Sequence, residues 1–111
     1  MRFAVSGSLL DACVLGLVAE KPAYGYELTQ RAQSVISVSE STLYPVLRRL
    51  QKEGLLSTFD KPFDGRNRRY YKITGAGTKK LAELVETWDD YTTRIDTLLK
   101  SKNVKGEGTD E

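Results

Sequence analysis

The chain has 111 residues, of which 40% are hydrophobic and 29% charged, a composition typical of one folded globular domain rather than a disordered chain. It has no histidine and one cysteine, so a zinc site and a histidine base are excluded, and we expect neither an enzyme nor a cofactor-binding protein. No apolar run approaches the length of a membrane span, and the lone Cys13 favours a reduced, cytoplasmic protein.

Positive charge gathers in the middle of the chain, although the net charge is only +2. Residues 21–72 carry ten basic and five acidic side chains, whereas the segments before and after them are slightly acidic. This distribution is typical of a region that faces a polyanion.

Two helices are predicted in the first third of the chain. The first runs from a cap at Ser8 to about residue 20, with apolar residues at helical spacing, and Lys21-Pro22 ends it. The second runs from about residue 24 to 32. It contains Gly25, which lowers helix propensity but would let another element approach closely.

A third helix is predicted to end near Glu53, with three leucines on one face and a glycine after its last turn. Two serines are candidates for its N-cap, so the first residue of the helix is not decided. A cap at Ser41 puts Pro45 in the fourth helical position, where the missing N–H costs little. A cap at Ser39 would cost a hydrogen bond, so we favour the later start or an irregular first turn.

A β-hairpin is predicted next. One strand runs from Leu55 to about Asp60, the other from Arg68 to Thr74, and the loop between them is longer than the tightest hairpin turn. Alternation in the second strand predicts an apolar face with Tyr71 and Ile73 and a basic, aromatic face with Arg68, Tyr70 and Lys72.

The last predicted helix is capped by Thr74, has Gly75 and Gly77 in a loose first turn, and continues to about residue 100. Its apolar stripe runs for roughly five turns, more than a small monomer would leave in water, so it predicts an interface between subunits. The polar residues from Ser101 onward are expected to be disordered.

The expected fold is therefore mainly α with a small β-hairpin, that is, a winged helix-turn-helix followed by a C-terminal dimerisation helix. We divide the chain into a DNA-binding domain at residues 1–74, a dimerisation helix at 75–100 and a disordered tail at 101–111.

The third helix has the composition of a recognition helix. Small hydroxyls near its start and arginines a turn later suit a major groove, although any amphipathic helix has a polar face. Its outward side carries Ser41, Pro45, Arg48 and Lys52, flanked by Thr42, Arg49 and Tyr44. The basic hairpin beside it favours DNA over simple solvation, since a wing can reach phosphates with Lys61, Arg66, Arg68 and Arg69.

Three motifs, YGYEL, STLYPVLRRLQKEGLL and GRNRRYYKITGAG, make the chain resemble the PadR family of transcriptional regulators over roughly residues 7–100. The family's Tyr-Gly-Tyr, Leu-Tyr-Pro and Gly-Arg-Arg-Arg-Tyr-Tyr fall on residues 24–26, 43–45 and 65–71, with Asn67 in place of one arginine. The resemblance implies a homodimeric repressor of the subclass with one C-terminal helix, double-stranded DNA with a palindromic operator as its partner, and Tyr24 among the DNA contacts.

The expected dimer interface draws on the first and final helices. It comprises Leu9, Leu10, Cys13, Leu84, Val85, Trp88, Tyr91, Ile95 and Leu98. Trp88 has two interpretations. It is an aromatic residue of the dimer core, or, by similarity to multidrug-binding relatives, it lines a pore between subunits and stacks on planar aromatic ligands.

The leading hypothesis is a dimeric, sequence-specific DNA-binding repressor that a small-molecule effector releases from its operator. The alternative is a winged-helix module that binds protein and uses its basic face for solubility. The charge excess of residues 21–72 favours the first, and salt-sensitive binding to DNA or heparin would discriminate between them.

Overall fold

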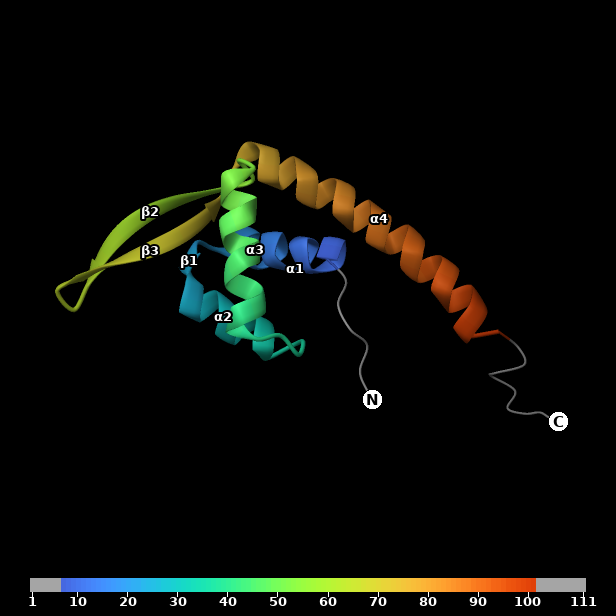
Figure 1. The fold of residues 1–111 in the computed structure, drawn as a ribbon. Helices are drawn as coiled ribbons and strands as arrows, with labels where there is room; N and C mark the ends of the chain where they lie inside the picture. Colours follow the sequence, from blue (N-terminus) through green and yellow to red (C-terminus); the bar gives the residue numbers. More distant parts are fainter. Residues whose placement is uncertain (1–6, 102–111) are drawn as a thin grey trace.

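The computed structural model describes residues 7–101. Its elements are α1 (Gly7–Glu20), β1 (Ala23–Tyr24), α2 (Gly25–Gln33), α3 (Glu40–Lys52), β2 (Leu56–Phe63), β3 (Arg66–Ile73) and α4 (Gly75–Leu99). The β2–β3 hairpin, here called the wing, projects to one side of α3, and α4 leaves toward the other side (Figure 1). The predicted winged helix-turn-helix is confirmed. Across these residues, no helix has the length and apolar character needed to cross a membrane.

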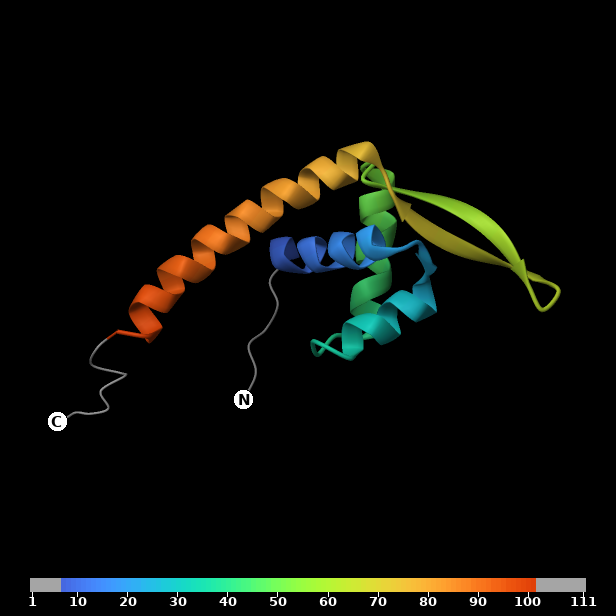
Figure 2. The same cartoon turned by 180° about the vertical axis from the view of Figure 1, so that it is seen from behind.

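The core lies where α1, α2, α3 and the base of the wing meet, with α1 crossing α3 (Figures 1 and 2). Leu43, Leu47 and Leu50 of α3 are at most 1% exposed, which confirms the predicted apolar face. Burying a leucine side chain contributes about 1.5–3 kcal/mol, so this face anchors α3 to the core. The core also contains Leu10, Val14, Leu15, Val18, Ala23, Leu28, Ala32 and Leu56.

The start of the chain differs from the prediction at two helices. Helix α1 already includes Gly7, so Ser8 lies within the helix and is not its cap. Helix α2 begins at Gly25, because Tyr24 belongs to β1 and pairs with Tyr70 of β3. The two-residue strand β1 was not predicted, since so short a segment has no detectable period.

Helix α3 starts earlier than we favoured. Ser39 is the cap, and its side chain accepts a hydrogen bond from the Thr42 backbone N–H at 3.2 Å. Pro45 therefore lies inside the helix, where it cannot donate to the carbonyl of Ser41. Because Ser41 is exposed, water can reach that carbonyl, which limits the cost.

The hairpin loop is much shorter than predicted. Both strands continue to a two-residue turn, Asp64-Gly65, whose residues have φ of 52° and 76°. Asp-Gly tolerates these positive φ values and gives the tight turn that suits the twist of paired strands. Pro62 fits because β2 is an edge strand in the order β1-β3-β2.

The two faces of β3 are divided as predicted. Tyr71 and Ile73 pack against the core. Tyr70 lies on the other face, where its ring contacts Tyr24 and Phe59. The wing is therefore attached to the domain through the core contacts of one face and, on the other face, through Tyr24 of β1.

The end of α3, the base of the wing and the start of α4 meet at one tight junction. Thr74 caps α4 by accepting from the Gly77 N–H at 3.0 Å, and its hydroxyl donates to the Gly54 carbonyl at 2.7 Å. A Cβ on Gly77 would lie 2.1 Å from the Leu55 carbonyl oxygen. The first turn of α4 is thus tightly packed, and the expectation of a loose turn was wrong.

We expect Gly77→Ala to destabilise the fold by about 2 kcal/mol or more, because the clash is with backbone that cannot rotate away. The control is Gly75→Ala, where no atom lies within 4 Å of the added methyl. There, better helix propensity should leave stability unchanged or raised by up to about 1 kcal/mol. Denaturant unfolding at one protein concentration measures both, and equal midpoints for the two variants would contradict this account.

Candidate nucleic-acid interface and apolar groove

The outward side of α3 is free for a ligand. Ser41, Pro45, Arg48 and Lys52 are all exposed and lie opposite the buried leucines, as the helical period predicted. None of the ion pairs within residues 7–101 involves Arg48 or Lys52. Their charges are therefore not neutralised by these neighbours, which is what contact with a polyanion requires.

The hydroxyl groups at the start of α3 form a small network. The Ser39 hydroxyl donates to Thr42 Oγ1 at 3.0 Å and lies within hydrogen-bonding distance, 2.9 Å, of Ser41 Oγ. These groups surround the N-terminal end of the helix, whose free backbone N–H groups and dipole favour an anion. The cap residue thus orients two of the residues predicted to contact DNA.

Arg49 has a different setting from Arg48, although the two are adjacent. Its guanidinium donates to the carboxylate of Asp11 on α1 and lies 3.4 Å from Glu53. The hydrogen bond that Arg49 donates to Asp11 is the main cause that raises the pKa of Arg49 above its ordinary value. We therefore move Arg49 from the expected DNA contacts to the residues that hold α3 against α1.

Tyr44 occupies the opposite flank of α3 and packs against α2. A Cβ on Gly25 would lie 2.8 Å from Tyr44 Cε1, so the expected close approach at this glycine is with the recognition helix itself. Tyr44 is half-buried, and burial is the main cause that raises the pKa of its hydroxyl. Its ring helps to set how α2 and α3 cross.

One face of the wing is a cluster of aromatic rings and cations, which we call the outer face. The Arg68 guanidinium carbon lies 3.8 Å from the ring centroid of Phe63 and 4.4 Å from that of Tyr24. The Tyr70 ring lies between those of Tyr24 and Phe59, with its centroid 5.5 Å from the first and 5.4 Å from the second. Phe59 and Phe63 had no predicted role. Phe59 fell within the predicted first strand and Phe63 beyond its end, and the observed register puts both on this face.

The four basic residues predicted for the wing do not share one face. Lys61 stands opposite Arg68 across the hairpin, with its ammonium 5.5 Å from the Tyr70 ring, and Arg66 is beside the turn. Arg69 lies on the other face, 3.9 Å from Asp60. The outer face thus holds Lys61, Arg66 and Arg68 together, whereas Arg69 lies near an acid on the opposite face.

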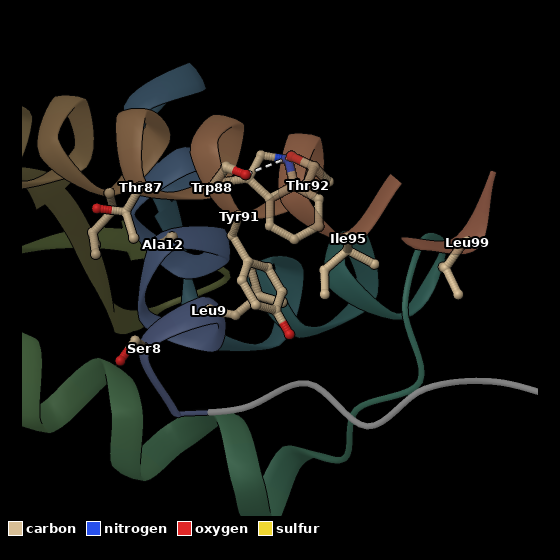
Figure 3. Close-up of a pocket in the computed structure, with 10 residues that line it drawn as sticks. Ser8, Leu9, Ala12, Thr87, Trp88, Tyr91, Thr92, Ile95 and Leu99 are labelled. Atoms are coloured by element: carbon tan, nitrogen blue, oxygen red, sulfur yellow. Dashed lines mark hydrogen bonds between the residues drawn. The ribbon is translucent and has the colours of Figure 1, made fainter. Parts of the chain in front are cut away.

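A separate apolar groove of about 750 Å³ lies between α1 and α4. Figure 3 shows the rings of Trp88 and Tyr91 beside it, 6.5 Å apart between centroids. Of the residues predicted for the dimer interface, the groove lining includes Leu9, Leu84, Trp88, Tyr91 and Ile95.

The remaining residues predicted for the dimer interface lie elsewhere. Leu10 is only 6% exposed and belongs to the core of its own protomer, so we remove it from the expected interface. Cys13 is half-buried, and Val85 and Leu98 are exposed on α4 outside the groove lining.

Comparison with known proteins identifies this arrangement. The sequence profile of the transcriptional regulator PadR-like family matches residues 14–83, which include α2, α3 and the whole wing. The chain belongs to the PadR family. Its members are DNA-binding regulators of transcription, so the exposed side of α3 and the outer face of the wing are the surfaces to consider for DNA.

Solved structures share this fold, and one of them is a PadR-like transcriptional regulator. The chain is 36% identical to smu.1704 of Streptococcus mutans, with a TM-score of 0.82 and 100% of both chains covered. It is 35% identical to the PadR-like transcriptional regulator BC4206 of Bacillus cereus, with a TM-score of 0.76 over 83% of this chain and 92% of that one. It is also 41% identical to transcriptional regulator Rv3488 of Mycobacterium tuberculosis over 63% of this chain and 66% of that protein.

Proposed function

We propose that this PadR-family chain is a non-enzymatic, cytoplasmic repressor whose dimer reads a palindromic operator. The observation that carries the proposal is the outward side of α3. Its basic and hydroxyl side chains are exposed on a helix whose opposite face is fully buried, next to a wing with a basic outer face. A rigidly held helix of this kind suits direct readout in the major groove.

The residues divide by the part of DNA that they would contact. Arg48 can bridge two acceptors on guanine, whereas Ser41 and Thr42 sit where a phosphate would meet the start of α3. Lys61, Arg66 and Arg68 of the wing are positioned for phosphates. Base contacts would supply specificity, and phosphate contacts would supply salt-dependent affinity.

Adjacent arginines give a matched test of this proposal. We expect Arg48→Ala to cost roughly 1–3 kcal/mol on the operator and little on random DNA, because a base contact discriminates. Arg49→Ala removes the same charge, but its guanidinium is held by Asp11, so we expect a smaller loss of discrimination.

A suitable measurement is a gel shift on the DNA upstream of the chain's own gene, with random DNA as competitor and salt varied. Equal losses on both DNAs for Arg48→Ala would remove the groove assignment. Salt-insensitive binding, or none, would favour the alternative that this winged helix is a protein-binding module.

A second copy of the chain is the proposed occupant of the groove between α1 and α4. Trp88 is 42% exposed, Tyr91 57% and Leu98 72%, an apolar stripe too large for an isolated small protein to leave in water. A two-fold dimer would cover the stripe with its own counterpart. The same symmetry would present two recognition helices to two half-sites.

We expect Ile95→Glu to shift the chain from dimer to monomer, because it would bury an unpaired carboxylate in the dimer interface. The matched control is Thr97→Glu, on an exposed position of α4 outside the groove lining. Sedimentation velocity measures the mass of each. If Ile95→Glu stays a dimer and binds DNA like the parent, the dimer interface lies elsewhere.

The proposed effector site lies between the two copies, where the groove of one protomer faces its counterpart. The exposed Trp88 ring, with Tyr91 beside it, offers a wall for a planar aromatic ligand, and offset stacking contributes about 0.5–1.5 kcal/mol per aromatic pair beyond area burial. Ligand binding would relieve repression only if the dimer geometry that holds the ligand differs from the one that fits DNA.

We expect planar cationic dyes to quench the fluorescence of Trp88, the only tryptophan, saturably and near one dye per dimer, and to weaken operator binding. Trp88→Leu should abolish the effect of the dye on the gel shift while keeping the dimer. If dyes at tens of micromolar neither quench Trp88 nor alter the shift, Trp88 is a dimer-core residue.

A further inference from the structure

Phe63 is an apolar ring at a place where burial does not explain it. It is the last residue of β2, next to the turn of the wing, and 47% of it is exposed. It makes a cation–π contact with Arg68, whose guanidinium carbon is 3.8 Å from its ring centroid, and it pairs across the hairpin with Arg66. Tyr24 approaches the same guanidinium at 4.4 Å from a different element, β1.

Contact with two aromatic rings leaves the edges of a guanidinium available. The planar group stacks through its faces, while its five N–H donors point outward in the plane. In residues 7–101 no acidic side chain forms an ion pair with Arg68. The side chain is thus fixed in place without its charge being neutralised.

The neighbouring cations lack this combination. Arg69 is close to Asp60, and Lys61 has a ring on one side only. Arg66 is the cross-strand partner of Phe63, but among the described residues its guanidinium does not lie over an aromatic ring. Arg68 is therefore the wing cation whose position is set before any ligand arrives.

We propose that Phe63 and Tyr24 are positioning residues, which hold the Arg68 guanidinium ready for a bidentate contact with one DNA phosphate. This inference rests on the proposed DNA-binding function. Ordering a long side chain on binding costs conformational entropy, and stacking removes part of that cost in advance. The bidentate geometry needs a guanidinium, so a lysine cannot replace it.

Tyr24 also ties this phosphate contact to the recognition helix. It is the residue before α2 and pairs with Tyr70 of the wing, while Gly25, the next residue, packs on Tyr44 of α3. Two consecutive residues, Tyr24 and Gly25, therefore connect the position of Arg68 to α3. The clamp, that is, the Arg68 guanidinium held by Phe63 and Tyr24, sets the distance between the phosphate contact of the wing and the bases that α3 reads.

The experiment uses the full chain and a random-sequence DNA duplex, because a phosphate contact does not depend on the operator. Fluorescence anisotropy over a range of KCl gives affinity and salt slope. We expect Phe63→Leu to weaken binding by about 3- to 10-fold for each wing engaged. Phe63→Tyr keeps an aromatic ring and should bind like the parent. Arg68→Lys should lose affinity although the net charge is unchanged.

The matched control is Phe59→Leu, on the same strand and face, whose ring stacks on Tyr70 and not on Arg68. It should bind within about 2-fold of the parent, a difference of roughly 0.4 kcal/mol. In an Arg68→Ala background, Phe63→Leu should have no further effect, since it acts only through Arg68.

Four results would overturn the inference. Equal effects of Phe63→Leu and Phe59→Leu would mean that any loss of wing packing weakens binding. An undiminished effect of Phe63→Leu in the Arg68→Ala background would mean that the ring acts independently. A parent chain that binds in a salt-dependent way while Arg68→Ala binds equally well would remove the clamp and leave the DNA-binding function standing, whereas a parent chain that does not bind the duplex would remove both.

Discussion

The contact between the first turn of α4 and the carbonyl of Leu55 determines how the parts of this protein are placed. Only a glycine at position 77 lets the helix start there, and Thr74 completes the joint by bonding both Gly77 and Gly54. The end of α3, the base of the wing and the start of α4 therefore meet at one point. The direction in which α4 leaves is fixed relative to α3, and with it the groove relative to the proposed DNA surface (Figure 2).

Helix α1 links the two surfaces. On one side it holds α3 through the pair between Asp11 and Arg49, and on the other its Leu9 and Ala12 line the groove beside Trp88. A ligand or a partner subunit that moved α1 would therefore act on α3 through a neighbouring residue rather than through a long pathway. This proximity gives the proposed effector response a short physical route.

The sequence was sufficient for features that repeat and insufficient for features that depend on partners far along the chain. Periodicity predicted all four helices, the buried leucines of α3 and the alternation of β3, because burial follows the period of each element. It could not distinguish Leu9, in the groove, from its neighbour Leu10, in the core, since both fit a helical apolar face. The role of Arg49 depends on Asp11, 38 residues away, and that of Phe63 on the hairpin register.

Arg68 and Arg69 show why charge composition alone misjudges such a surface. They are identical and adjacent, but strand alternation sends them to opposite faces, where one meets aromatic rings and the other Asp60. Arg48 and Arg49 differ in the same way on a helix. The positive charge left for DNA is therefore smaller than the count of basic residues and is concentrated on the outer face of the wing and the outward side of α3. A few well-positioned cations would fix the orientation of the protein on DNA. Each phosphate contact would then constrain which bases α3 can reach.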